Sequence, residues 1–326
     1  MPIIQNNSDF LFLYDATLCN PNGDPDQENK PRMDYDTKTN LVTDTRLKRS
    51  IRDYLKSEGV EIFVDMEGDN KVSPDTKLKN VINRIFNNES DVNDLFIEKP
   101  VFKEKFVEVI KDKKDADGFF KHLQDKKNIE LNSYILAQLV KNKFVDIRMF
   151  GSAFAVGGFT KAYTGSIQIN WGYSVHQVDL VESNSIVTTM NDGNSTFGKD
   201  YRVYYSLLAF NGTINKYAAQ QTGLTEADRE TFRNAIWNAV SANPTRSKLN
   251  QYAKMYIEVL YNDGFSNGYF GDLRKYVEVK TTKDNVRELQ NLEIDFIKLK
   301  SLIDENRGEN KPIKDIYMKK HTEINF

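Results

Sequence analysis

The sequence contains little of what metal and redox chemistry needs: one cysteine, Cys19, and three histidines in 326 residues. A single cysteine cannot form an intrachain disulfide or a cluster of thiolate ligands. The histidines, His122, His176 and His321, are widely separated and show no paired spacing of the kind that holds a metal ion. We therefore expect no cofactor and no metal centre.

Long apolar runs are also missing. No stretch approaches the roughly 18 residues needed to span a bilayer, and no basic segment followed by an apolar one opens the sequence. These absences favour a cytoplasmic protein that does not contact a membrane. The formal net charge is only −2, so a nucleic-acid binder of this composition would have to gather its positive charge locally.

The chain has ample material for a core, with 39% hydrophobic and 12% aromatic residues, and its length fits two domains or one domain with a large insertion. Apolar patterning predicts strands at Asp9–Leu18, Val60–Asp65, Asp146–Phe154, Gly165–Glu182, Tyr201–Ile214 and Lys254–Tyr261. It predicts helices at Thr45–Ser57, Lys77–Phe86, Lys103–Lys111, Ser133–Lys141 and Val286–Ile303, and one from Thr225 to a stop at Asn243-Pro244. The apolar run in the first strand indicates burial on both faces.

The stretch from Asn20 to Tyr54 organises the chain. Its first part is a loop in which Pro21, Gly23 and Pro25 restrict or free the backbone, which is typical of a binding loop with amides available to an anion. The loop contains alternating oxygen ligands, but an EF-hand would need glycine and glutamate where Pro25 and Pro31 stand. A calcium site is therefore poorly supported.

The helix behind this loop carries a row of cations. Arg46, Arg49 and Arg52 follow one another at intervals of three residues, and Lys48 lies beside them. Such a surface suits phosphates, although a solvated helix face would look the same. A second small cationic cluster, Thr245-Arg-Ser-Lys248, also suits phosphate oxygens, with an ordinary surface turn as the competing interpretation.

Three further segments have a distinctive residue composition. Residues 66–143 are polar and mixed in charge, with short helical periods, and indicate an inserted helical subdomain. The pair Phe150-Gly151 puts an aromatic ring beside a residue without a side chain, which would let a nucleotide backbone approach closely or would simply end a strand. Residues 183–200 surround a few apolar side chains with small polar ones and predict a protruding hairpin, with a functionless loop as the alternative.

Four segments together carry a family resemblance. They are Asn20-Pro-Asn-Gly-Asp-Pro25 with Pro31-Arg32 and Val42–Asp53, then Asp146-Ile-Arg-Met-Phe-Gly151, Gly165–Gly172 and Thr245–Lys248. In this order they resemble the backbone subunit of type I CRISPR surveillance (Cascade) complexes, within the RAMP superfamily and the Csh-type branch of subtype I-B. The resemblance extends from about residue 10 to about residue 275.

The resemblance implies an α+β fold: a modified RNA-recognition (ferredoxin-like) palm with an inserted helical finger subdomain and a protruding thumb hairpin. The palm would comprise residues 1–65 and 144–280, the finger 66–143, the thumb 183–200, and a C-terminal helix and tail 281–326. The aromatic RNP consensus of an ordinary RNA-recognition module is missing. Binding should therefore rest on loops and cationic helices.

The implied function is that of a non-catalytic subunit that polymerises along CRISPR guide RNA and presents it to target DNA in antiviral defence. Its partners would be the guide, the target strand, neighbouring copies of itself and other Cascade subunits. The expected thumb residues are Ile186, Val187 and Met190. The expected RNA-binding residues are Asn22, Gly23, Asp24, Arg32, Arg46, Lys48, Arg49, Arg52, Phe150, Gly151, Phe197, Arg246, Ser247 and Lys248.

A second function remains open at this point. Related branches of the superfamily include metal-dependent or acid-base endoribonucleases, and in this chain Asp15, Asp24 and Asp26 would be the natural acids, with His176 as a base. Acids in such a loop are also good turn formers. A core or hydrogen-bonded role is the better interpretation of His176.

Overall fold

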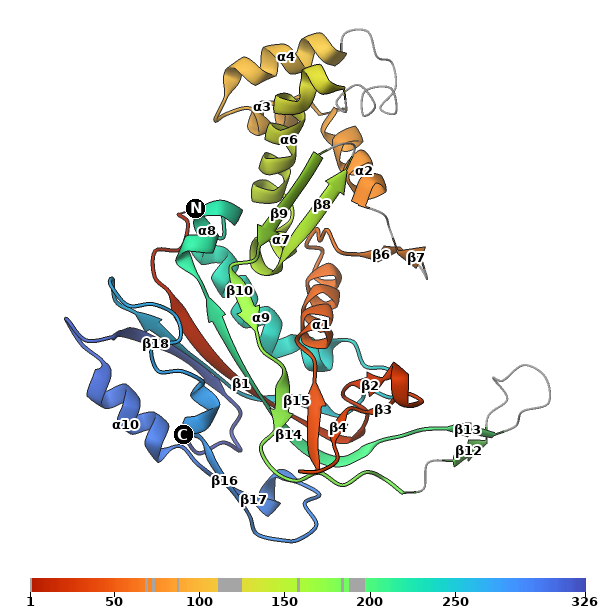
Figure 1. The fold of residues 1–326 in the computed structure, drawn as a ribbon, viewed down its shortest axis with the longest axis vertical. Coiled ribbons are helices and arrows are strands. Elements are labelled where there is room, and N and C mark those ends of the chain that lie inside the picture. The colour runs from red at the N-terminus through yellow and green to blue at the C-terminus, as the bar shows by residue number, and fades with distance from the viewer. Residues whose placement is uncertain are drawn as a thin grey trace. The chain divides into compact units, whose positions relative to one another are not determined.

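The computed structural model describes residues 2–67, 70–71, 74–86, 88–110, 125–156, 159–182, 185–187 and 197–326. The fold is mixed α/β, and the chain divides into two compact units (Figure 1). Unit 1 consists of Met1–Ile3, Leu55–Ser166 and Tyr217–Arg229. Unit 2 consists of Ile4–Tyr54, Ile167–Lys216 and Glu230–Phe326.

Unit 2 is built on an eight-stranded sheet in which every recorded pair of strands is antiparallel. The order is β18-β15-β1-β14-β11-β5-β4, and β10 also pairs with β14. Their bounds are β1 Ser8–Cys19, β4 Met33–Asp34, β5 Thr39–Val42, β10 Ile167–Ile169, β11 Gly172–Ser174, β14 Val203–Ile214, β15 Gln251–Tyr261 and β18 Ile313–Lys320. Strand β1, which lies inside the sheet between β15 and β14, is the first of these strands in the sequence.

Strand β1 is buried on both faces, as its apolar run predicts. On one face Phe10 lies 5.4 Å, centroid to centroid, from Phe232 of α9 (Glu226–Ala242). On the other face Leu11 and Leu13 join a cluster with side chains of the C-terminal segment, among them Leu299. Alternate residues of a strand face opposite ways, so one strand holds both layers together.

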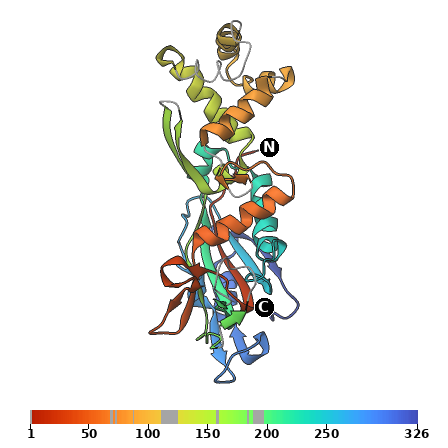
Figure 2. The same ribbon diagram turned by 90° about the vertical axis from the view of Figure 1, so that its right-hand side faces the viewer.

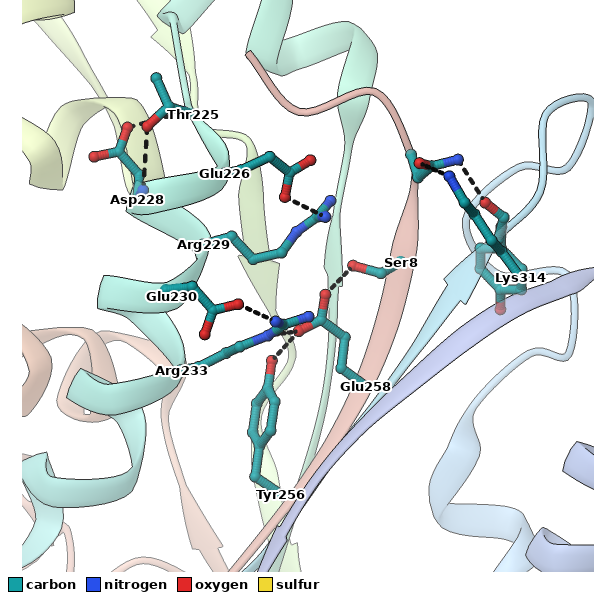
Figure 3. Close-up of polar contacts among 12 residues, drawn as sticks. Ser8, Thr225, Glu226, Asp228, Arg229, Glu230, Arg233, Tyr256, Glu258 and Lys314 are labelled. Carbon is teal, nitrogen blue, oxygen red and sulfur yellow. Dashed lines mark hydrogen bonds and ion pairs between the residues drawn. The ribbon is translucent and has the colours of Figure 1, made fainter. Parts of the chain in front are cut away.

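Helix α9 is tied to the sheet by a buried polar network (Figure 3). The carboxylate of Glu258 on β15 is fully buried. It accepts hydrogen bonds from Ser8 Oγ at 2.6 Å, Arg233 Nε at 2.8 Å and the Tyr256 hydroxyl at 2.9 Å. A buried charge is costly unless it is paired. The carboxylate of Glu258 therefore needs these donors in place, and this requirement fixes the position of α9 on the sheet.

The C-terminal segment differs from its prediction. In place of one helix over Val286–Ile303, the structure has η4 (Leu289–Asn291), β17 (Leu292–Asp295) and α10 (Ile297–Asn306), preceded by η3 (Leu273–Tyr276) and β16 (Glu278–Thr281). Strand β17 pairs with β16, and the carboxylate of Asp295 accepts a 2.7 Å hydrogen bond from the backbone N–H of Ile297 where α10 begins. The spacing of the apolar residues suits a helix, but these residues reach the core from two separate elements, β17 and α10.

The loop between β1 and α1 (Asp44–Ser57) folds into small hairpins that can be followed in red in Figure 2. It contains β2 (Gly23–Asp24), η1 (Pro25–Gln27) and β3 (Lys30–Pro31), followed by the pair β4 and β5. The single strand predicted over Gly165–Glu182 is wrong. The structure has two short strands there, β10 and β11, and the second ends at Ser174. In the break, the side chain of Asn170 accepts a 2.8 Å bond from the N–H of Trp171. Of the hairpin predicted over residues 183–200, the structure describes two paired strands, β12 (Ser185–Val187) and β13 (Phe197–Lys199), and the residues between them lie outside the described ranges.

Unit 1 is mainly helical. Its helices are α2 Pro74–Phe86, α3 Glu89–Leu95, α4 Pro100–Ile110, η2 Lys126–Asn128, α6 Ile129–Asn142, α7 Val145–Phe150 and α8 Lys216–Thr222, whose first residue belongs to unit 2; its hairpins are β6 Met66–Glu67 with β7 Asn70–Lys71, and β8 Gly151–Val156 with β9 Phe159–Thr164. The helices predicted near Lys77, Lys103 and Ser133 are confirmed by α2, α4 and α6.

Of two strands predicted in unit 1, one is absent and one is shortened, and both differences involve Asp146. Asp146 lies in α7 instead of a strand, and its fully buried carboxylate accepts hydrogen bonds from the N–H groups of Phe63 at 2.8 Å and Val64 at 3.1 Å. A side chain thus takes the place of the neighbouring strand that Val60–Asp65 would have needed. The strand predicted from Asp146 begins only at Gly151.

The helix start predicted at Thr225 is confirmed. The N–H of Asp228 bonds to Thr225 Oγ1 at 3.2 Å, and the N–H of Thr225 bonds back to the Asp228 carboxylate at 2.9 Å, a reciprocal cap visible in Figure 3. Among the helices in the described ranges, none is long and apolar enough to cross a membrane.

Candidate nucleic-acid interface

The loop after β1 is held to the start of α1 by Asn22. Its side-chain oxygen accepts hydrogen bonds from the backbone N–H of Thr43 at 2.9 Å and from the Thr43 hydroxyl at 3.0 Å. Thr43 in turn accepts a 3.1 Å bond from the N–H of Arg46, which caps the helix. At Gly23 an added Cβ would lie 1.9 Å from Asn29 Oδ1, so any other residue there would displace the side chain of Asn29.

Arg32 crosses this loop. Its guanidinium lies 3.3 Å from the carboxylate of Asp24 and 5.9 Å from the ring centre of Trp171, which is 45% exposed. Within the described chain its Nε is buried without a hydrogen-bond partner. Arg32 and Trp171 therefore present a guanidinium and an open aromatic ring side by side, an arrangement on which a base can stack.

The structure brings the turn at 245–248 against the end of β1. The N–H of Asn20 donates to the carbonyl of Ser247 at 2.8 Å, and the ammonium of Lys248 donates to the carbonyl of Asn20. Burial, and then the charge of Arg46, lower the pKa of Lys248 to about 8. The two cations therefore lie close enough to repel each other, although about 200 residues separate them in the sequence.

Neither of these two cations is neutralised by a carboxylate within the described residues. No ion pair is recorded there for Arg46 or Lys248, and the amides of the first turn of α1 add a partial positive charge beside Arg46. An anion placed between them would relieve the repulsion. This is the physical requirement of a phosphate site.

The other predicted cations of α1 already have interaction partners within the protein. Lys48 pairs with Asp44 at 2.9 Å and Arg49 pairs with Asp53 at 2.6 Å, each one helical turn apart on the same helix. Arg52 also has an interaction partner in the structure. The cationic row predicted from spacing is present, and within the described ranges no ion pair is recorded for its first member, Arg46.

The base of the hairpin formed by β12 and β13 adds residues that the sequence did not single out. Arg202 donates to the carbonyls of Leu18 at 2.7 Å and Arg246 at 3.2 Å, and the Arg246 side chain pairs with Asp200 at 3.0 Å. Lys199 pairs with Glu28 of the loop at 2.9 Å. No pattern in the sequence marks these contacts, because each one joins residues that are distant along the chain.

Other predicted residues lie elsewhere. Phe150 and Gly151 belong to unit 1, where Phe150 is 8% exposed and a Cβ on Gly151 would lie 2.2 Å from the carbonyl oxygen of Tyr163. The missing side chain of Gly151 therefore lets β8 and β9 approach closely. Of the predicted hairpin residues, Ile186 and Val187 are in β12 and Phe197 is in β13, while Met190 lies outside the described residues.

The candidate catalytic residues are engaged in structural contacts. His176 is buried: its Nε2 accepts a 3.1 Å hydrogen bond from the N–H of Leu207, its Nδ1 lies 2.7 Å from the carbonyl of Gln177, and burial lowers its pKa. Asp24 accepts a 3.2 Å bond from the N–H of Asp26 besides pairing with Arg32. In the part of the chain that the structure describes, no group of three or more His, Cys, Asp or Glu side chains could hold a metal ion.

These observations define a class of protein: a mixed α/β chain with an antiparallel sheet, along one end of which a structured loop, a capped helix and a cationic turn converge. The sequence profile of the family described as CRISPR-associated protein Cas7 matches residues 6–297. The chain belongs to this family.

Individual similarities are more distant. The CRISPR-associated protein Cas7 of Haloferax volcanii is 27% identical over 318 residues, which covers 90% of this chain and 82% of the relative. Among solved structures, a chain of a CRISPR RNA-guided surveillance complex in a pre-nicking state superposes with a TM-score of 0.45 at 12% identity, covering 80% of both chains. A chain of another CRISPR RNA-guided surveillance complex gives a TM-score of 0.39 at 12% identity, covering 81% of this chain and 78% of that one.

Proposed function

We propose that this protein binds CRISPR guide RNA without cleaving it and forms the backbone of a type I Cascade complex of the Csh-type branch of subtype I-B. The proposal rests on one observation: Arg46, Lys248 and the Asn20–Arg32 loop converge on a positively charged site, and no carboxylate in the described residues neutralises its two cations. Phosphate contacts of this kind position RNA without reading its sequence. Family membership supports the same conclusion.

The strand order supports an RNA-recognition-type palm. Strands β15, β1, β14 and β11 are neighbours in this order, β14 and β15 are joined by α9, and both are antiparallel to the β1 that lies between them. That is the arrangement of a split βαβ core. We assign the palm to residues 1–65 and 144–280, the finger to 66–143, the thumb to 183–200, and a C-terminal helix and tail to 281–326.

In this proposal several copies line up on one guide in the cytoplasm, together with other Cascade subunits, and leave the bases free to pair with target DNA. The thumb of each copy reaches the next one. Its contacts at the base favour such a role, because Lys199 and Arg202 connect the hairpin directly to the loop and turn that we assign to RNA.

The first test asks whether the purified protein retains RNA and whether the two cations hold it. Absorbance at 260 nm and gel analysis should reveal bound RNA of defined length in the wild type. A double variant, Arg46→Ala with Lys248→Ala, should bind all RNAs more weakly and lower the salt slope by roughly 0.7 per lost contact. The matched control replaces two exposed cations of the C-terminal segment, Lys298→Ala with Arg307→Ala. Equal affinities and slopes for the two double variants would refute the assignment.

A second test concerns the thumb. Replacing residues 186–195 by a short Gly-Ser turn should leave binding to a short RNA intact, because the phosphate contacts come from the loop, α1 and the 245–248 turn. Assembly on a long RNA should lose its cooperativity and the periodic reactivity of bases to chemical probes. Filaments with unchanged length and periodicity would show that the hairpin is only a loop.

The endoribonuclease alternative predicts a different result. If the protein is a non-catalytic binder, labelled guide and target RNA should remain intact with magnesium or manganese present. Cleavage that disappears in an Asp24→Ala variant would replace our proposal with the nuclease.

A further inference from the structure

A cavity in unit 2 has no part in the proposed RNA interface. It has a volume of about 550 Å³ and lies where β1, β14, β15, α9 and the C-terminal segment meet. Its lining includes Asp15, Tyr205, Trp237, Tyr252, Lys254 and Glu323. All of these belong to one compact unit, so the cavity is a feature of a single body.

The floor of the cavity holds a buried carboxylate with an unused acceptor. Asp15 is 5% exposed, and its Oδ2 accepts from the Tyr205 hydroxyl at 3.2 Å and lies 3.1 Å from the ammonium of Lys254. Its Oδ1 is buried, and no residue in the described ranges donates a hydrogen bond to it. A buried acceptor without a donor is costly, and a ligand that brings an N–H group would supply what is missing.

The charge around this floor is negative. Lys254 lies between two carboxylates, 3.1 Å from Asp15 and 2.6 Å from Glu323, so one ammonium serves two acids. The other cation of the lining, Arg287, already has partners: its guanidinium lies 3.1 Å from the carboxylate of Asp179 and 3.8 Å from the ring centre of Tyr204. A phosphate would meet these acids, whereas a cation would complete the balance.

The shape of the lining further restricts the ligand. Lys254 already occupies the position between the two carboxylates, so a small metal ion would find no room among them. Tyr252, which is 49% exposed, offers an open aromatic ring in the lining, whereas the ammonium of Lys319 already lies over the ring of Trp237, 4.8 Å from its centre. A planar group with several N–H donors can stack on the Tyr252 ring and still reach a carboxylate, which an ammonium does less well.

We infer that this cavity binds a guanidinium group, which donates to Asp15 Oδ1 and stacks against Tyr252. The group is supplied either by an arginine side chain of a partner protein or by a small guanidino compound. The site is separate from the RNA interface, so it stands or falls independently of the proposed function.

The test uses the full chain with Trp171→Phe, which leaves Trp237 as the remaining one of its two tryptophans and as a fluorescent reporter. Titration with N-acetyl-L-arginine methylamide should give a saturable change with a dissociation constant of about 1 mM or tighter. The uncharged citrulline analogue should bind at least about tenfold more weakly, because a charge-assisted hydrogen bond is lost. No saturation by the arginine probe, or equal binding of both probes, would overturn the inference.

Variants and a second probe complete the design. Asp15→Asn should weaken binding about tenfold or more. Because that change also disturbs Lys254, Tyr252→Ala at the exposed opening gives an independent check, with an expected weakening of about threefold. Tyr269→Ala, an exposed tyrosine outside the cavity, is the matched control and should bind like its parent. Unchanged affinity in both cavity variants would refute the site.

Free L-arginine and agmatine, compared with the blocked amide, identify the source. A preference for the blocked amide points to a protein side chain, and a preference for the free compounds points to a small molecule. Either preference supports guanidinium recognition.

Discussion

The depressed pKa of Lys248 makes RNA binding depend on pH in a way that an ordinary surface lysine would not. Burial and the charge of Arg46 bring this pKa from the usual 10.5 to about 8 in the free protein. At about pH 7 roughly nine-tenths of the free molecules carry the charge, and at about pH 9 roughly one-tenth do. A bound phosphate favours the charged form and raises the pKa again.

The expected magnitude follows from this proton linkage. If the phosphate returns the pKa of Lys248 close to its usual value, affinity should fall by about tenfold, or about 1.4 kcal/mol, between about pH 7 and about pH 9. A lysine that already titrates near 10.5 would change the affinity far less over the same range. The change of RNA affinity with pH therefore reports on the buried ammonium of Lys248.

The assay is a fluorescence-anisotropy titration at constant ionic strength with a short RNA of adenine and cytosine, whose bases do not titrate in this range. Lys248→Arg keeps its charge at every pH used, so its affinity should be nearly independent of pH. Lys248→Met should bind weakly and also without pH dependence. A flat profile for the wild type, or an equal slope in Lys248→Arg, would refute the reasoning.

The same shift affects the stability of the free protein. Because the folded-state pKa of Lys248 lies below the unfolded-state value, the unfolded chain binds more protons between about pH 8 and pH 10.5. The contribution of this group to stability therefore rises with pH through that window and is lost as the pH falls through about 8. Saturating RNA should remove this dependence.

Three further outcomes are expected. Arg46→Ala should weaken RNA binding more than Arg49→Ala in a salt titration, because Arg49 already has a carboxylate partner on its own helix; equal losses would contradict this. Gly23→Ala should weaken RNA binding with little change in melting temperature, since its Cβ would collide with the side chain of Asn29 in a surface loop; unchanged affinity would show that the loop shape does not matter. Glu258→Ala should cost about 3–5 kcal/mol in urea unfolding, because the buried Arg233 would lose its buried carboxylate and keep only the exposed Glu230 as a charge partner; a loss below about 1 kcal/mol would mean that the network relaxes.

Much of the fold could be predicted where the signal is local. The run from Phe10 to Leu13 required burial on both faces, and β1 is an interior strand covered on both sides. Thr225 and Asp228 predicted a helix start, and they cap each other reciprocally. Glycine and proline in the Asn20–Pro31 loop predicted a defined non-repeating shape, and at Gly23 the side chain of Asn29 does approach the backbone closely. Such features depend on backbone geometry and on neighbours within a few residues, which a sequence displays directly.

Other features depended on packing between distant segments. Asp146 satisfies the N–H groups of a segment more than 80 residues earlier, so that segment does not form its predicted strand and the strand predicted from Asp146 begins only at Gly151. The apolar residues of the C-terminal segment have helical spacing, yet pairing between β16 and β17 was more favourable than continuing one helix.

The candidate site shows the same division. The sequence by itself determined the cations, hydroxyls and loop-forming residues that a phosphate site needs, because residue type sets charge and hydrogen-bonding capacity. Only the tertiary structure decided which cations act together. It placed Arg46 beside Lys248 and buried Asp15 with one oxygen unused. Charge, burial and distance act together in setting the chemistry of a group, and only the charge can be read along a chain.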